Sequence, residues 1–434
     1  MIRKLLLSCI LVSVMVRVPL CAQEAGKYRL TLRQAQEYAL QHNRTIMNSS
    51  LAIRQAEADK WQAIASMLPQ LTATGTYNNM FDFTIDFGQK FAMPSVIQYG
   101  GTASLAVSAA QIISTQIANL SKSISDISLK QTEQEVAEQV KTLYFSALVA
   151  SETIELLQQN LESLNKLYNF SAKAVEVGTA EKLDADQILV QVATMENTIS
   201  SSQRSLEVVY NTLRLALCLD YDMEIELVQT LDEVLDIDRA MVMLSDDFLL
   251  DNNFSWQLMQ KSVELSKKQY NMAGWAYAPT LSGYYQYSGK KYLSDEMRLD
   301  MTPPHTLGLT LTVPIFSSGV NNAKRKSARM AYETQLNNLS DTELSLRLLH
   351  RQCKYNLTSA YERYQTQKKS VDVSQSVFDN MTKKYQYGMS SALDVTNAST
   401  ALINAQTNYV TVALDFVNAQ IELEKLLNKN ILDK

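Results

Sequence analysis

Few residues in this chain have types and spacings that could support covalent or metal chemistry. The 434 residues include three histidines and four cysteines. His42, His305 and His350 have no serine, cysteine or carboxylate at a spacing that would form a catalytic group. The sequence also has no phosphate-binding glycine loop, zinc-ligand spacing or nucleophile elbow. We therefore expect no enzyme activity, metal ion or cofactor. A net charge of −5 argues against a nucleic-acid partner.

Two carboxylates nevertheless recur in one local pattern. Asp184 follows Gly178 by six residues, and Asp394 follows Gly388 by the same interval, with a leucine directly before each aspartate. The two glycines are 210 residues apart. Because isolated glycines between long apolar-periodic segments mark turns, both aspartates are expected just after a turn.

The interval of 210 residues also separates other anchors, which indicates an internal duplication. Pro279 follows Pro69 by 210 residues, and Leu423–Leu427 resembles Leu213–Leu217 in the same register. Each repeat is expected to contain a helix, a strand pair and two long helices. The predicted boundaries are a first repeat at 23–219, an acidic linker or equatorial section at 220–255 and a second repeat at 256–434.

The scarcity of glycine and proline predicts unusually long helices. There are 12 glycines and 7 prolines, most of them in two clusters, and the breaker-free runs predict helices at 115–177, 180–219, 320–386 and 391–428. Apolar residues recur at coiled-coil spacing, namely Val192, Met195, Ile199, Leu206, Val209 and Leu213, and later Ile403, Thr407, Val410, Leu414, Val417 and Ile421. The helices are therefore expected to pair antiparallel. Cys218 and Cys353 are expected to be unpaired helix residues.

The two glycine- and proline-rich clusters predict strand pairs at about 70–110 and 280–314. Apolar and small polar residues alternate there. One predicted face carries Leu105, Val107, Leu309 and Leu311, and the other carries Ser104, Ser108, Thr310 and Thr312. Strands of about ten residues cross a bilayer when tilted, so the apolar face is predicted to meet lipid and the polar face a lumen. A soluble β-subdomain is the alternative.

Four strands cannot close a barrel, so a membrane function requires several copies. Two chains would supply eight strands, and a barrel of that size is filled by its own side chains. Three chains would supply twelve, which leaves room for a water-filled pore. Conduction thus favours three or more copies.

The first 22 residues predict a secretory signal peptide. Arg3 and Lys4 precede an apolar run, and small residues allow cleavage after Ala22. Lipidation at Cys21 is the weaker interpretation, because the residues before it are a poor match to a lipoprotein signal. The chain is thus expected to leave the cytoplasm.

The duplicated order resembles the TolC-like outer-membrane efflux protein family over roughly residues 28–428. Its most specific pieces are Val313-Pro314-Ile315-Phe316-x-x-Gly319 and Tyr385-x-x-Gly388-x-x-x-x-Leu393-Asp394-Val395. The resemblance implies a homotrimer, with a twelve-stranded β-barrel in the outer membrane of a Gram-negative cell continuous with a twelve-helix periplasmic tunnel. It implies an exit duct for efflux or type I secretion, partnered by an adaptor protein and an inner-membrane pump. The first strand-to-helix junction, Gln111-Ile112-Ile113, departs from the family pattern by lacking the later glycine.

The resemblance also implies roles for particular residues. The adaptor-docking tips would be Val177, Gly178, Thr179, Tyr387, Gly388, Met389 and Ser390. Asp394 would line the narrow periplasmic pore entrance, with Asn397 where a second acidic residue is common and Asp184 in the other repeat. Ser390 replaces a basic residue, so a charge link from there to Asp184 is missing. The alternatives are that each glycine only caps a helix and that Asp394 is a solvated residue at a helix start.

A periplasmic coiled-coil scaffold or adaptor is the competing function. It would also have a signal peptide and long helices. It would not need two strand pairs with one apolar and one small polar face at matching places in both repeats. The sequence therefore favours the channel.

Overall fold

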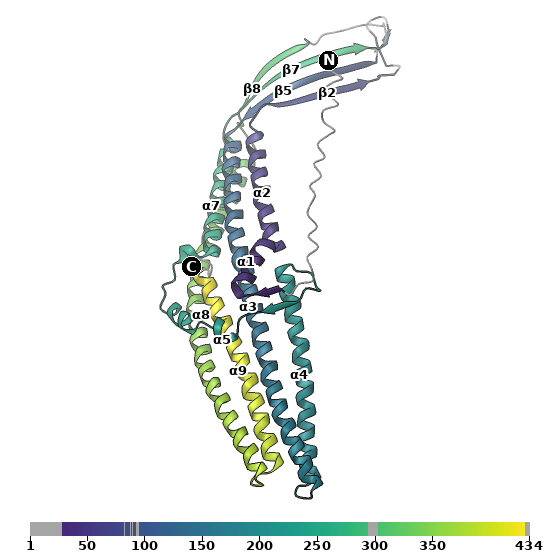
Figure 1. Cartoon of the computed structure of the whole chain (residues 1–434). Helices are drawn as coiled ribbons and strands as arrows, with labels where there is room; N and C mark the ends of the chain where they lie inside the picture. Colours follow the sequence, from purple (N-terminus) through teal and green to yellow (C-terminus); the bar gives the residue numbers. More distant parts are fainter. Residues whose placement is uncertain are drawn as a thin grey trace.

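The computed structural model describes residues 28–81, 83–86, 88, 90–92, 95–293 and 303–429. Within them the chain forms a long rod of helices with a sheet at one end (Figure 1). The signal peptide predicted at residues 1–22, with Cys21, lies outside the described residues.

Two helices run from the sheet to the far end of the rod. They are α3, Ala109–Glu176, and α8, Val320–Gln386 (Figure 1). At 68 residues α3 is ~100 Å long. Shorter helices stand beside them, with α2 (Arg44–Ala65) and α7 (Phe254–Gly274) near the sheet and α4 (Lys182–Leu217) and α9 (Ala392–Leu427) in the far half.

One asparagine in each repeat fixes the start of the helix that lies near the sheet, α2 in the first repeat and α7 in the second. Asn43 ends α1 (Leu32–His42) and caps α2 by accepting the Thr45 N–H at 2.8 Å. Its Nδ2 donates to the carbonyl of Ala216 in the last turn of α4 at 2.8 Å. The buried Asn43 side chain thus pairs a free N–H at the start of α2 and a free carbonyl at the end of α4, and it holds the two helices end to end.

The second repeat contains the same joint 210 residues later. Asn253 accepts the Trp256 N–H to cap α7 and donates through Nδ2 to the carbonyl of Leu426 at 3.2 Å. The lower helices also end alike. Cys218 after α4 and Asn428 after α9 both adopt positive φ, at 56° and 51°. Cys218 is therefore a left-handed cap, not the helix residue that the sequence predicted.

A small mixed section surrounds the middle of the rod. Strand β1 (Tyr28–Leu30) pairs in parallel with β6 (Ile225–Leu227). The short helices α5 (Leu231–Val234), α6 (Ile237–Met243) and η2 (Leu250–Asn252) follow β6. The acidic stretch 220–255 thus forms mixed structure beside the helices, and β1 is a strand that sequence analysis did not predict.

The sheet combines both repeats. Its order is β2-β5-β7-β8, all antiparallel, and the β5–β7 pairing joins the first repeat to the second. The strands are β2 (Gln70–Asn78), β5 (Val96–Val107), β7 (Thr280–Tyr292) and β8 (His305–Thr312). A separate hairpin, β3 (Thr84–Asp86) with β4 (Lys90–Ala92), lies in the connection from β2 to β5.

The two strand-to-helix junctions differ. In the first repeat Ser108 lies outside β5 and is the N-cap of α3, where Ser108 and Gln111 form a capping box. The prediction that Ser108 faces a lumen from the strand is therefore wrong, and α3 begins before position 115. In the second repeat seven residues, 313–319, separate β8 from α8, and the turn ends at Gly319 with φ +81°.

The core follows the helix seams. On α4 the predicted heptad positions Val192, Met195, Ile199 and Leu213 are buried. On α9 the predicted seam is wrong in part, because Thr407 is exposed and Ile403 is half-buried while Leu402 and Phe416 are fully buried. The cause is that α9 packs against α3, α4 and α8 together, so it buries more than the single stripe of a coiled coil.

No helix among the described residues is long and apolar enough to cross a membrane.

Candidate functional site

The sheet carries one continuous apolar face. The strand register aligns Leu105 with Gly283 and Gly283 with Leu309, and likewise Val107, Leu281 and Leu311. Directly paired residues of antiparallel strands share a face, so the four predicted apolar residues lie together. That face carries Leu71, Ala73, Tyr77, Ile97, Tyr99, Ala103, Leu105, Val107, Leu281, Tyr285, Tyr287, Leu307, Leu309 and Leu311. A protein in water would have to cover it.

The opposite face is mainly polar, with several serines and threonines. Ser104 pairs with Gln70 and Tyr284, and Thr310 and Thr312 pair with Ser282 and Thr280. Threonines of β2 continue the same face. The sheet therefore has the two-sided character of a wall between an apolar medium and water.

Within the described part of the chain, neither face is covered by a second layer. Leu309 is 80% exposed, Leu71 is 81% exposed and every residue of β2 is exposed. The outer edges of β2 and β8 have no neighbouring strand in the sheet. Unpaired edge groups are a template for another strand, and a bare apolar face is unstable in water. The open edges of the sheet thus require strands from another chain, and its apolar face requires an apolar environment.

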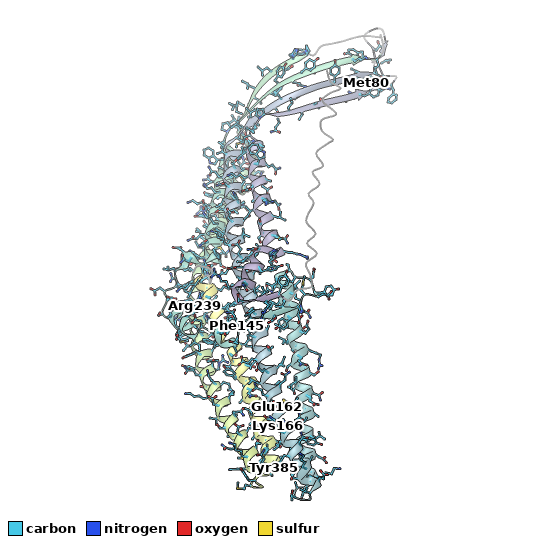
Figure 2. The ribbon with its side chains drawn as sticks, in the orientation of Figure 1. Met80, Phe145, Glu162, Lys166, Arg239 and Tyr385 are labelled. Atoms are coloured by element: carbon cyan, nitrogen blue, oxygen red, sulfur yellow. The ribbon has the colours of Figure 1, made fainter. Side chains whose placement is uncertain are left out.

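Aromatic side chains border the apolar face. Tyr285 and Tyr287 lie on it in the middle of β7, beside the outer end of the shorter strand β8, where the Tyr285 hydroxyl and His305 Nδ1 are 2.8 Å apart. Figure 2 shows Met80 at that free end. At the helical end Ile315 and Phe316 are 94% and 87% exposed, and Trp61, Trp275 and Tyr277 are exposed on nearby helix ends. Aromatic belts at both borders are typical of membrane-spanning sheets.

The far end of the rod consists of two helical turns of the same design. After α3, Gly178 adopts φ +77° and its N–H donates to Val175, while Thr179 N–H donates to Ala174 at 2.8 Å. After α8, Gly388 adopts φ +72° with the matching pair of bonds, the second from Met389 to Lys384 at 2.8 Å. Both turns are Schellman caps, so the glycines do serve the capping role.

The turns also present apolar side chains to solvent. Val177 is 72% exposed, Tyr387 77% and Met389 69%, and Leu183 and Leu393 are exposed at the starts of the next helices. Thr179 and Ser390 lie between them. A Cβ placed on either glycine would meet no atom within 4 Å. The backbone conformation, not crowding, therefore requires glycine at these positions.

The Asp394 side chain accepts hydrogen bonds from the residues at the start of α9. Its Oδ2 accepts from the Ser391 N–H at 3.0 Å, the Ser391 hydroxyl at 2.7 Å and the Ser390 hydroxyl at 3.1 Å. The Asp394 N–H donates to Ser391 Oγ, which completes a capping box. The Ser391 backbone bond, with the two hydroxyls, lowers the pKa of Asp394 below its ordinary value. Asp394 is exposed, and so is Asn397 one turn later.

Asp184 holds the matching place on α4 but not the matching contacts. The N-cap of α4 is Glu181, which makes no side-chain capping bond, and Asp184 is half-buried. No side-chain hydrogen bond to Asp184 is found in the described part of the chain. The two turns thus share a backbone and differ in how they hold their carboxylate.

The two helical hairpins are fastened to each other just above these turns. Leu167, Ile188, Phe378 and Val395, from four helices, form one buried cluster. The Tyr385 hydroxyl donates to Ser171 Oγ at 2.9 Å across the hairpins, and Figure 2 shows Tyr385 close to the end of the rod. The ends therefore form one packed unit.

A buried charge cluster links α3 to α9 near the middle of the rod. Lys141 Nζ and Glu424 Oε2 are 2.6 Å apart, and both side chains are 5% exposed. Arg239 of α6 lies 3.7 Å from Glu424. Burial lowers the pKa of Lys141, an effect that Glu424 opposes. Sequence analysis missed this pair, because the two residues are 283 positions apart.

Glu138 lies one turn before Lys141. Burial raises its pKa to about 7, and Lys425, at 3.6 Å, opposes the rise. The asparagine joints at Asn43 and Asn253 were missed as well, although their spacing of 210 residues was a readable signal in the sequence.

Comparisons with known proteins agree with this architecture. A sequence profile described as "Outer membrane efflux protein" matches residues 36–218 and 247–429. Outer membrane protein TolC of Escherichia coli (strain K12) is 21% identical over 406 residues, which covers 88% of this chain and 79% of TolC.

Solved structures give the same result for the fold. The CmeC outer membrane channel of Campylobacter jejuni superposes with a TM-score of 0.76 at 15% identity, over 91% of this chain and 85% of CmeC. The outer membrane protein VceC of Vibrio cholerae gives 0.74 at 15% identity, over 91% and 95%. The sheet, the rod and the paired turns are thus a recurrent fold.

Proposed function

The chain belongs to the outer membrane efflux protein family, and from that membership we propose that it is the outer-membrane exit duct of a tripartite efflux assembly. It resides in the outer membrane and extends into the periplasm. Substrates pass through it from an inner-membrane pump to the exterior. The family is one of channels, not of enzymes.

One observation carries this proposal, namely the four-stranded sheet with an apolar face, a small polar face and two open edges. Its apolar face, with Leu105, Val107, Leu309 and Leu311, lies against lipid. Ser104, Thr310 and Thr312 line the lumen. Three copies close a twelve-stranded barrel by pairing β8 of one copy with β2 of the next, the smallest number that leaves a water-filled interior.

The exposed apolar residues at the lateral edges support ring closure along the rod. Helix α8 exposes Leu344, Leu348 and Tyr355, and helix α4 exposes Val190, Val208 and Leu215. These helices stand at opposite edges of the chain. Packing the α8 edge of one copy on the α4 edge of the next buries both sets, which gives a trimeric helical tunnel below the barrel.

The far turns are the proposed meeting point with a periplasmic adaptor. The exposed residues Val177, Thr179, Tyr387 and Met389, with the half-buried Ser390, flank the two capping glycines. An apolar patch at the tip of a rod suits the hydrophobic contact of a helical hairpin. Asp394, with Asn397 beside it, contributes one carboxylate ring to the pore entrance, and Asp184 contributes less.

A soluble periplasmic scaffold is the second candidate, and membrane fractionation with planar-bilayer recording separates the two. The channel should remain in outer-membrane extracts, require detergent for release and give discrete conductance steps after purification. A scaffold would be released with the periplasmic fraction and would leave the bilayer silent. That outcome would overturn the proposal.

A further inference from the structure

A groove lies between α2, α3 and α7 directly beneath the sheet. Its volume is 640 Å³, and its lining includes Lys60, Met67, Ile112, Gln116, Asn119 and Lys268. Helix α3 forms the middle of the groove, between α2 and α7, so the groove does not depend on the open edge at α8.

Two ammonium groups that line this groove, from α2 and α7, form no salt bridge within the described part of the chain. Lys60 Nζ of α2 donates to Asn119 Oδ1 at 2.9 Å, and Lys268 Nζ of α7 donates to Gln116 Oε1 at 2.8 Å. Asn119 and Gln116 are neighbours on one face of α3, because they are three residues apart. Neutral amides thus hold both lysines in place, and the carboxylate closest to Lys60, that of Glu57, is already paired with Lys122.

The other charges close to the groove largely cancel. Lys261 lies 3.2 Å from Glu264, and Lys122 lies 2.6 Å from Glu57, three residues before Lys60. The groove therefore keeps the net positive charge of Lys60 and Lys268. Basic residues at the start of α8, namely Lys324, Arg325 and Lys326, add to the positive potential at this level, whereas Arg329 is paired with Glu333.

The groove also has an apolar side that leads toward the sheet. Ile112 is 50% exposed and lies five residues after the end of β5, and Met67 lies three residues before β2. Trp275 directly follows α7, two helical turns after Lys268, and is 53% exposed. Tryptophan and lysine on one face beside a membrane-spanning sheet are typical of the headgroup level of a bilayer.

We propose that this groove binds the phosphate headgroup of an anionic phospholipid from the periplasmic leaflet. Lys60 and Lys268 contact the phosphate oxygens, and the first part of an acyl chain follows Met67 and Ile112 toward the apolar face of the sheet. The proposal rests on the proposed position of the sheet in the outer membrane. Membrane-anchored lipid is favoured over a free anion because the groove is half apolar and opens at the membrane border.

Native mass spectrometry of the purified full chain in detergent tests the site, with phosphatidylglycerol and phosphatidylcholine as probes. Each lysine near an anionic lipid adds about fivefold in affinity. The unaltered protein should therefore prefer phosphatidylglycerol by about 25-fold. The double variant Lys60→Gln/Lys268→Gln should bind the two lipids alike. Lys267→Gln is the matched control, because it removes the adjacent charge outside the groove and should keep the preference.

Three results would overturn the proposal. They are a preference retained by the double variant, an equal loss in Lys267→Gln, or displacement of phosphatidylglycerol by inorganic phosphate at the same phosphorus concentration. The last result would identify a site for free anions. Insertion into liposomes of phosphatidylcholine alone is measured in parallel. Failure to insert would count against the channel itself, whereas insertion without lipid preference would remove only the groove.

Discussion

Helices α3 and α8 hold corresponding places in the two repeats, yet their side chains meet very different surroundings. Phe145 of α3 is 2% exposed, whereas Tyr355, its counterpart 210 residues later, is 68% exposed. Lys141 is buried in an ion pair, whereas the matching Arg351 is exposed. Duplication has preserved the backbone, and the place of each helix in the molecule has decided its chemistry.

The cause of the difference is position. Helix α3 packs against α1, α2, α4, α7 and α9, so partners from both repeats surround it. Helix α8 packs mainly on α7 and α9 and stands at the edge of the chain. An interior helix can retain buried polar pairs, whereas an edge helix keeps apolar residues exposed until another copy covers them.

The largest loss of stability is expected when the buried ion pair between Lys141 and Glu424 is broken. Lys141→Met would leave Glu424 buried with a neutral donor, the Gln420 amide at 3.1 Å, and the more distant Arg239 at 3.7 Å, which should cost about 3–5 kcal/mol of unfolding free energy. Arg351→Met, at the matching position of α8, should change stability little because that side chain is exposed. Guanidinium denaturation of both variants measures the contrast. Equal losses would show that α8 is as enclosed as α3.

In the sheet, unlike in α3 and α8, matching positions of the two repeats should be equally sensitive to substitution, because both repeats contribute to one apolar face. Leu309→Arg should cost about 2–4 kcal/mol in the bilayer, and Leu105→Arg should be similarly harmful in the first repeat. Thr310→Arg, on the polar face, should assemble far better. The yield of assembled protein in outer-membrane extracts reports this. Equal assembly of Leu309→Arg and Thr310→Arg would refute the assignment of Leu309 to the lipid face and Thr310 to the lumen.

Asn43 and Asn253, which each cap one helix and hold the end of another, test whether the two repeats depend on the same contact. Asn43→Ala and Asn253→Ala each remove an N-cap and leave a helix-end carbonyl unpaired, so each should cost about 1–2 kcal/mol. Hydrogen exchange should rise at the start of α2 in one variant and of α7 in the other. A large effect in only one of them would show that the 210-residue correspondence is incidental there.

These residues also show what the sequence could and could not predict. The long helices and the shared face of the strands were predictable, because glycine, proline and alternation are local signals. Lys141 with Glu424, the β1–β6 pair and the several buried faces of α9 were not, because each depends on segments far apart in the chain. Ser108 was misplaced because a serine suits either a strand face or an N-cap.

A smaller effect is expected from pH, through Glu138 on the interior helix. Its pKa is raised to about 7, so the neutral form is favoured in the folded state. Stability from this group is present at pH below about 4.5 and is lost as pH rises through about 7. Glu138→Gln should flatten that dependence. Thermal unfolding between pH 5 and about 8 measures it, and an unchanged slope in the variant would exclude Glu138 as the cause.

The smallest effect on stability, and the most informative for conduction, is expected at the two turns. Asp394 accepts three hydrogen bonds, which lower its pKa, so it stays ionised well below neutral pH, whereas Asp184 has no such side-chain contacts in the described part of the chain. If three copies bring their Asp394 carboxylates together at the pore entrance, they favour cations. Asp394→Asn should then weaken cation selectivity in planar-bilayer recordings, and Asp184→Asn should weaken it less. The N-cap Ser391 is unchanged in this variant, and the amide oxygen of the new side chain can still accept from the Ser391 N–H, so a change in selectivity would not reflect a lost helix start. If Asp394→Asn leaves selectivity and divalent-ion block unchanged, the carboxylate serves the capping box alone, and the entrance must be formed by other residues of the turns.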